Sequence, residues 1–153
     1  MRIRLLAVGR LRDGAERTLL DDYLLRARRA GGGLGVRDVE EVEVAAGGGR
    51  DAEGVRLLAR LGAGPAIALD ERGEAWTSVE LSRRLARWRD SGEAQATFVI
   101  GGADGLSAEV LERARGRLAL GGLTWPHRLA RVMIAEQIYR ALSIEAGAPY
   151  HRE

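Results

Sequence analysis

Short runs of apolar residues recur along the chain, and each ends in glycine or in an acidic turn. Such runs predict β-strands that are buried on both faces of a parallel sheet. They cover residues 3–9, 65–70, 97–100 and 118–120. The segment 35–45 differs, because its valines alternate with charged residues, and it predicts a strand with one polar face near the edge of the sheet.

Between these runs, apolar residues recur at helical spacing. The predicted helices cover residues 15–30, 51–61 and 78–92 and a segment that starts at Ser107. In the second helix we expect Val55, Leu58 and Leu61 to share the buried face. The alternation predicts an α/β fold class: one domain over residues 1–153, with a mostly parallel five-stranded sheet and helices on both faces.

The last predicted helix begins at Pro126 and is apolar nearly all round, so it must be buried within the monomer or against a second copy. Arg131 and Glu136 interrupt its apolar runs without sharing a face, so each needs its own partner. Buried pairing would satisfy Arg131. Glu136 has Arg140 four residues later, a spacing that supports a helix.

Composition narrows the possible classes of protein. The 153 residues are 46% hydrophobic and 30% charged, which is ordinary for a globular domain. No stretch approaches the roughly 20 apolar residues of a membrane span, and no signal peptide is recognisable, so we expect a cytoplasmic protein. Without cysteine, and with two distant histidines, neither a disulfide nor a metal site is expected. The net charge of +2 permits an RNA partner without requiring one.

Two strand ends carry glycines in place of side chains, at residues 101–105 and at Gly121 and Gly122. In an α/β sheet, bare backbone at strand ends commonly lines a ligand crevice. With apolar walls from Leu69, Leu120, Leu123 and Trp125, this crevice would suit an adenine-bearing ligand, although tight turns would explain the glycines equally well. The spacing does not match G-x-G-x-x-G, which disfavours a Rossmann dinucleotide site.

Other candidate features leave alternatives open. Residues 47–49 are three glycines before a helix, but they lack the Lys and Ser/Thr of a P-loop and are interpreted as a mobile linker. Asp70 could hold a ribose or cap a turn. His127, in the first turn of the last helix, is expected to be neutral and to serve either as a hydrogen-bonding group or weak base or as a structural residue.

The C-terminal residues Tyr150, His151 and Arg152 bring together groups that can stack on a base, transfer a proton and contact phosphate. Chain ends are usually disordered and carry no such concentration of functional groups. We therefore interpret this tail as a candidate functional segment.

The chain closely resembles the RlmH (formerly YbeA) family. The motifs that carry the resemblance are residues 98–107, 123–132, 136–141 and 149–153, and it extends over the whole chain. Members of this family are SPOUT-superfamily enzymes that methylate N3 of a pseudouridine in bacterial 23S ribosomal RNA with S-adenosylmethionine as donor. One departure is the pair Gly121 and Gly122, where many relatives carry serine or alanine.

The resemblance implies a C-terminal SPOUT trefoil knot over about residues 97–153 and a homodimer built through the knotted region. It implies a substrate in 23S rRNA within the large ribosomal subunit or the assembled ribosome. The donor site that it implies comprises Leu69, Gly101, Gly102, Leu120, Gly121, Gly122, Leu123, Thr124 and Trp125. No metal is implied.

Methyl transfer to N3 requires the loss of its proton. Our hypothesis is that His151 or a nearby water assists this step, that Tyr150 seats the base, and that Arg152 anchors phosphate, reaching the active site of the other subunit. The rival hypothesis is a ribosome-associated RNA-binding protein that keeps the fold without catalysis. A nucleotide hydrolase is disfavoured because the chain lacks a P-loop and metal ligands.

Overall fold

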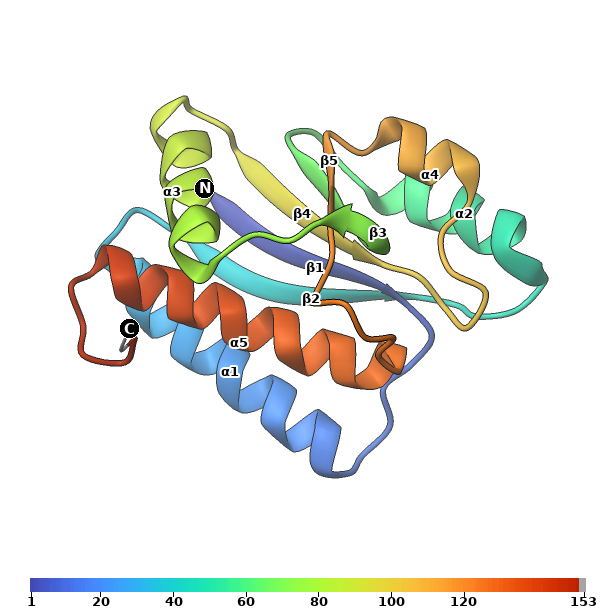
Figure 1. Ribbon diagram of the computed structural model, residues 1–153, viewed down its shortest axis with the longest axis horizontal. Coiled ribbons are helices and arrows are strands. Elements are labelled where there is room, and N and C mark those ends of the chain that lie inside the picture. The colour runs from blue at the N-terminus through green and yellow to red at the C-terminus, as the bar shows by residue number, and fades with distance from the viewer. Residues whose placement is uncertain (152–153) are drawn as a thin grey trace.

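The computed structural model describes residues 1–151, in which strands and helices alternate (Figure 1). The strands are β1 (Arg2–Val8), β2 (Asp38–Val44), β3 (Ala66–Glu74), β4 (Gln95–Ile100) and β5 (Gly116–Leu118). The helices are α1 (Ala15–Gly32), α2 (Gly49–Arg60), α3 (Ser78–Asp90), α4 (Ala108–Arg113) and α5 (His127–Glu145). The predicted α/β alternation is confirmed. The fifth strand lies earlier than residues 118–120, because the chain leaves the sheet after Leu118.

The five strands form one sheet in the order β2-β1-β4-β3-β5, and every adjacent pair is parallel. The predicted edge position of β2 is confirmed. Strand β3 is irregular where it pairs with β5, because Leu69 and Glu74 both face Leu118 and the intervening residues bulge. Parallel pairing brings the carboxyl ends of all the strands to one edge of the sheet, where α/β proteins bind ligands.

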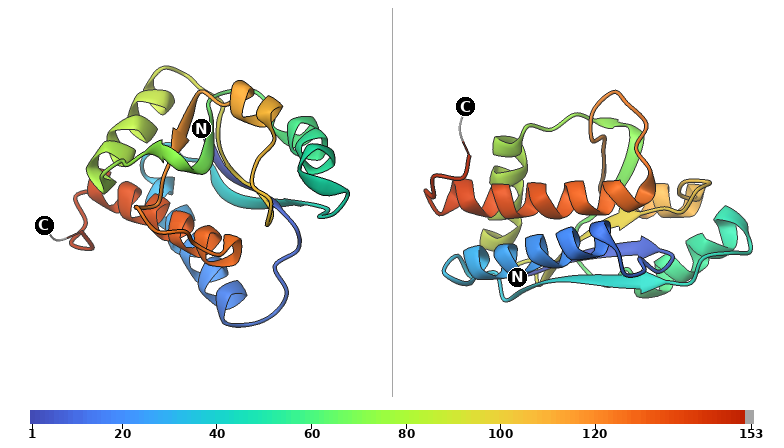
Figure 2. Two further views of the ribbon diagram at one scale, coloured as in Figure 1. Left: turned by 45° about the vertical axis from the view of Figure 1, so that its right-hand side comes forward. Right: turned by 90° about the horizontal axis from the view of Figure 1, so that it is seen from below.

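Helices cover both faces of the sheet, as predicted (Figure 2). Helices α1, α3 and α5 contribute to one apolar cluster, and α2 with α4 to the other. Along β1 the side chains alternate between the two, so that Leu5 joins the first cluster and Leu6 the second. No helix of residues 1–151 combines the length and apolar character needed to span a bilayer.

The expected buried face of α2 is partly wrong. Leu61 is buried, but Val55 is 68% exposed, and Glu53, Gly54 and Leu57 face inward instead. Gly54 faces inward because α2 lies very close to the start of α4 there: a Cβ on Gly54 would lie 2.2 Å from the Ser107 hydroxyl oxygen. Apolar spacing could not reveal this orientation, since neither glutamate nor glycine counts as a core residue in such a pattern.

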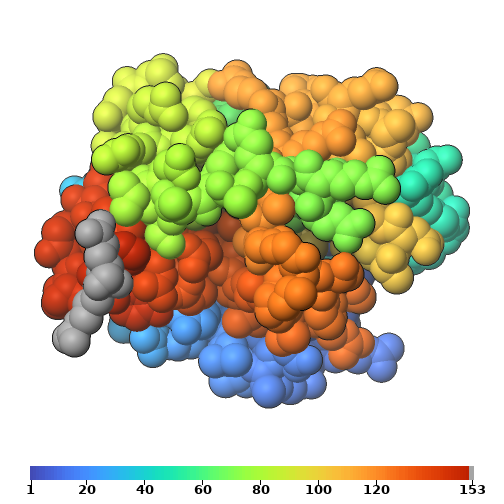
Figure 3. Space-filling view, viewed as in Figure 1, coloured from blue at the N-terminus to red at the C-terminus, as the bar shows by residue number. Residues whose placement is uncertain are grey.

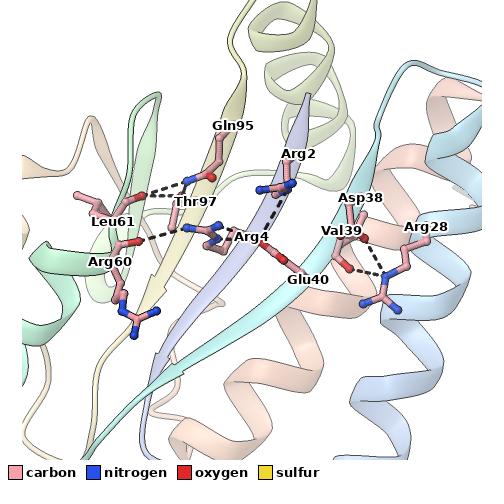
Figure 4. A network of polar contacts seen from close by, with 10 residues as sticks. All are labelled: Arg2, Arg4, Arg28, Asp38, Val39, Glu40, Arg60, Leu61, Gln95 and Thr97. Carbon is pink, nitrogen blue, oxygen red and sulfur yellow. Dashed lines mark hydrogen bonds and ion pairs between the residues drawn. The ribbon is translucent and has the colours of Figure 1, made fainter.

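A polar network joins the amino ends of the strands, opposite the edge where ligands are expected (Figure 4). Arg4 lies beside Glu40 in the β1–β2 register and donates two hydrogen bonds to its Oε1, of 2.9 and 2.8 Å. Arg4 also donates to the carbonyl of Arg60 at the C-terminus of α2, at 3.2 Å. This network gives the carbonyl at the C-terminus of α2 a hydrogen-bond donor and pairs the charges of Arg4 and Glu40 at the amino end of the sheet.

Candidate functional site

A cavity of about 420 Å³ opens at the carboxyl ends of β4, β3 and β5, three neighbouring strands. It will be called the slot. Its walls are the β3 bulge (Leu69, Asp70, Glu71 and Arg72), the turn after β4 (Gly102 to Leu106) and the segment after β5 (Leu120, Gly121, Leu123, Thr124 and Trp125), with Arg50, Leu111, Leu118 and Ala130. This volume falls within the usual range of small-molecule and cofactor pockets.

The slot gathers most of the predicted donor-binding residues. Seven of the nine line it: Leu69, Gly102, Leu120, Gly121, Leu123, Thr124 and Trp125. Gly101 is not among the lining residues, but it permits the tight turn beside the slot: a Cβ there would lie 2.7 Å from the carbonyl carbon of Gly105. Gly122 also does not line the slot, and an added Cβ would meet no atom within 4 Å.

Two hydrogen bonds fix the segment after β5, one within the segment and one to the β3 bulge. Trp125 donates from its indole nitrogen to the carbonyl of Leu120, at 3.0 Å. The Thr124 hydroxyl donates to Glu71 Oε2 on the β3 bulge, at 3.3 Å. The Trp125 ring is left 39% exposed, which makes its apolar surface available to a ligand.

Polar groups of the slot come mainly from the β3 bulge. Asp70 Oδ1 accepts a 3.0 Å hydrogen bond from the amide of Arg72, so the carboxylate caps the turn while it also lines the slot. Both interpretations of Asp70 thus stay compatible with the geometry. Sequence reasoning missed Arg50, which lines the slot from the start of α2. Its position directly after three glycines was the only signal, and that segment was interpreted as a linker.

His127 is the first residue of α5. Its pKa is lowered first by burial and then by the positive charges of Arg131 and Arg128, against a smaller opposing effect of Glu53. The predicted preference for the neutral form is confirmed in direction. Burial, rather than the helix dipole invoked from the sequence, is the leading cause.

Arg131 is 1% exposed and joins three elements. Its Nη1 lies 3.0 Å from the carboxylate oxygens of Glu41 and of Glu43 on β2. Its Nη2 donates to the carbonyls of Val8 and Gly9 at the end of β1, at 2.5 and 2.6 Å. The predicted buried pairing is confirmed, and this clamp fixes the end of β1 against α5.

The tail folds back on the middle of α5. The Tyr150 hydroxyl donates to Glu136 Oε1 at 3.0 Å, and the rings of Tyr150 and Tyr139 are 4.5 Å apart. Glu136 also pairs with Arg140, as the i, i+4 spacing predicted. Burial and the bond to Glu136 raise the pKa of Tyr150 above its ordinary value. His151 Nδ1 is buried without a partner among the described residues, and Arg152 lies outside them.

Within one chain, the predicted donor-binding residues therefore lie apart from the candidate residues of the tail. Neither Tyr150 nor His151 lines the slot. The tail lies nearer a second, mostly apolar groove of about 630 Å³, whose walls include Glu136. This groove runs between α1, α3 and α5, past the segment after β5 (Figure 3); its other walls include Leu19, Tyr23, Trp76, Leu81 and Met133.

Known proteins resemble the chain over its whole length. A family model described as a predicted SPOUT methyltransferase matches residues 1–151. The ribosomal RNA large subunit methyltransferase H of Hyphomonas neptunium is 56% identical over 153 residues, which is 99% of each chain. The protein of the same name from Dinoroseobacter shibae is 50% identical over 155 residues, again 99% of each chain.

One solved structure supports the fold. The probable methylase family protein from Haemophilus influenzae Rd KW20 superposes with a TM-score of 0.51 and 12% identity, over 99% of this chain and 70% of that chain. At this low identity the likeness concerns the arrangement of strands and helices alone.

Proposed function

This chain belongs to the SPOUT methyltransferase family, and we propose that it methylates N3 of a pseudouridine in 23S ribosomal RNA with S-adenosylmethionine as donor. The substrate would be the large ribosomal subunit or the assembled ribosome, in the cytoplasm. The observation that carries the proposal is the slot, which lies where the family motifs meet and has the size and chemistry of a donor site. The family also implies the C-terminal trefoil knot.

The residues of the slot fit the donor. Leu69, Leu120 and Trp125 offer apolar surface for an adenine ring, while Gly102 and Gly121 leave main-chain groups uncovered beside it. Asp70 and Glu71 supply carboxylates that can accept hydrogen bonds from ribose hydroxyls. When bound, the donor supplies a methyl group activated by a positively charged sulfur.

The chain contributes mainly by positioning. The bonds from Trp125 to Leu120 and from Thr124 to Glu71 hold the slot in shape before a ligand arrives. Alignment of two reactants in such a preformed site can account for a large part of a rate acceleration, roughly 7–11 kcal/mol in favourable cases.

We extend the proposal to a homodimer. Leu19 of α1 is 47% exposed, and the groove between α1, α3 and α5 that it lines offers apolar surface that a second copy can cover. Because neither Tyr150 nor His151 lines the slot of its own chain, the tail would serve the slot of the partner. There Tyr150 would seat the base, His151 would contact it, and Arg152 would bind phosphate.

Calorimetry with S-adenosylmethionine tests the donor site and separates the enzyme from its rival. We expect saturable binding, with a dissociation constant of roughly 1 μM–1 mM, the range of enzyme substrate affinities. Trp125→Ala should weaken it, since the ring lines the slot. Absence of binding to the wild-type protein would favour the alternative, a ribosome-associated RNA-binding protein without catalysis.

A further inference from the structure

A topological switch point adjoins the slot, between the carboxyl ends of β1 and β4. These strands are neighbours in the sheet, but the chain leaves them toward opposite faces. After β1 it continues into α1, and after β4 into α4, which packs on the other face (Figure 2). Such a switch point is where an open α/β sheet forms a crevice. Gly102 lies at both the switch point and the slot, because it comes shortly after β4 and also lines the slot.

Glu53 of α2 is nearly buried, at 8% exposed, and its carboxylate lies beside Gly102 and Val8 at this switch point. Its Oε1 accepts a 2.8 Å hydrogen bond from the amide of Gly47. Among residues 1–151 its Oε2 has no hydrogen-bond partner, and the carboxylate forms no ion pair. Among the described residues, the side-chain nitrogens and oxygens that are cut off from solvent and lack a hydrogen-bond partner belong to Arg17, Arg131 and His151. Glu53 Oε2 is not one of these atoms, so it keeps contact with solvent. A carboxylate this deeply placed ordinarily has both oxygens satisfied.

The turn after β4 is shaped around this carboxylate. A Cβ on Gly102 would lie 2.9 Å from Glu53 Oε2 and 3.2 Å from a methyl carbon of Val8. Glycine at this position therefore leaves room for the carboxylate between the turn and the end of β1. Glu53 Oε2, which has no hydrogen-bond partner among the described residues, thus lies against Gly102, which also lines the slot.

Charged groups on α5 and α2 lie near this switch point. His127 is close enough to Glu53 for the carboxylate to raise its pKa, while burial, Arg131 and Arg128 lower it. Arg131 itself is engaged by Glu41, Glu43 and the carbonyls at the end of β1. On α2, Arg56 donates to the carbonyl of Gly47, and Arg50 lines the slot. None of these arginines pairs with Glu53.

We propose that a crevice at this switch point receives the target base and that Glu53 Oε2 takes the proton from N3. This inference rests on the proposed function. The electron pair of N3 forms the new N–C bond, and the S–C bond of the donor breaks with its electrons left on sulfur. The N3 proton passes to Glu53 and then to solvent. Oε2 is free to accept it and belongs to a nearly buried side chain, whereas Glu71 in the slot is exposed.

Glu53→Gln tests the proton role. The glutamine can still accept the bond from Gly47, so we expect the variant to fold and to bind S-adenosylmethionine with unchanged affinity in calorimetry. Single-turnover methylation of ribosomes that lack this methyl group should fall at least about 100-fold near pH 7, the lower end of what a general base contributes. The deficit should shrink as pH rises, because N3 loses its proton to solution without help. Glu112→Gln, an exposed carboxylate on α4, is the matched control and should behave as wild type.

Two outcomes would overturn the proposal: a wild-type rate in Glu53→Gln, or a deficit in Glu53→Gln that does not shrink as pH rises. If the deficit of His151→Ala shrinks with pH instead, the proton role belongs to His151. Should Glu53→Gln fail to fold, Glu53→Asp keeps the charge but draws the carboxylate back by one methylene, and it must then be slow at unchanged donor affinity. If wild-type protein itself transfers no methyl group, the proposed function fails instead, so the two failures are distinguishable.

Discussion

Replacement of Arg131 by methionine should strongly destabilise the protein. The guanidinium makes four hydrogen bonds, two to the carboxylates of Glu41 and Glu43 and two to main-chain carbonyls at the end of β1. Methionine fills similar space but satisfies none of them. Loss of one partner from a buried charge network costs about 3–5 kcal/mol, because the remaining charges stay buried without compensation.

The remaining partners decide where in that range the effect falls. Glu41 keeps a bond to Arg17, at 2.6 Å, and Glu43 keeps one to the amide of Leu11, also at 2.6 Å. These bonds lower the cost of the missing cation. The buried carbonyl of Val8, however, loses a donor, which costs roughly 1–3 kcal/mol by itself. We therefore expect a loss of about 3 kcal/mol, a large share of the 5–15 kcal/mol that is typical of a domain.

Urea unfolding at a fixed protein concentration measures this loss, with the slope of the transition expected to stay unchanged. Arg83→Met, an exposed arginine on α3, is the matched control and should change stability by less than about 0.5 kcal/mol. Arg131→Lys should be intermediate, since it keeps the charge without the forked geometry. If Arg131→Met unfolded within about 1 kcal/mol of wild type, the clamp would not have the energetic role assigned to it.

The remaining predictions concern the slot and His127. Gly101→Ala should weaken S-adenosylmethionine binding at least about 10-fold, or 1.4 kcal/mol, because the new Cβ meets the Gly105 main chain. Gly122→Ala should bind the donor normally, and equal affinities of the two variants in calorimetry would refute this prediction. Donor binding should change the tryptophan fluorescence, and Trp125→Phe should abolish the change; a change that persists would place the donor elsewhere. Burial lowers the pKa of His127 in the folded protein, so the stability that its neutral form confers is complete above the unfolded pKa near 6.5 and is lost as pH falls through the folded pKa. Unfolding followed from about pH 8 to 5 should therefore show a smaller loss of stability in His127→Gln than in wild type. Identical pH dependence of the two proteins would contradict this.

Sequence pattern was sufficient for the parts of the fold that depend on local chemistry. Apolar runs located β1, β3 and β4, and the glycines after β4 and β5 located the slot, because bare backbone at strand ends is visible in the sequence. Thr124, by contrast, entered the candidate site through family resemblance. Spacing alone does not distinguish a residue that lines a ligand site from one that shapes a turn.

Features that depend on tertiary contacts could not be found in this way. Glu53 was not among the residues expected to be buried on α2, but it faces inward beside Gly54, which packs closely against Ser107. The bulge that brings Asp70 into the slot follows from the β3–β5 register, which no local pattern specifies. Likewise, Tyr150 gave no signal that it would bind Glu136 in the middle of α5.

Mass mapping of 23S rRNA is the most direct test of the central claim. Ribosomes from a strain that lacks this protein would be incubated with the purified protein and S-adenosylmethionine, and every modified nucleotide of the large-subunit RNA would be located. The account predicts that one pseudouridine gains one methyl group, at N3, and that this group is missing from the untreated deletion strain. If the RNA gained no methyl group, or gained it on another atom or another nucleotide, that result would contradict the account.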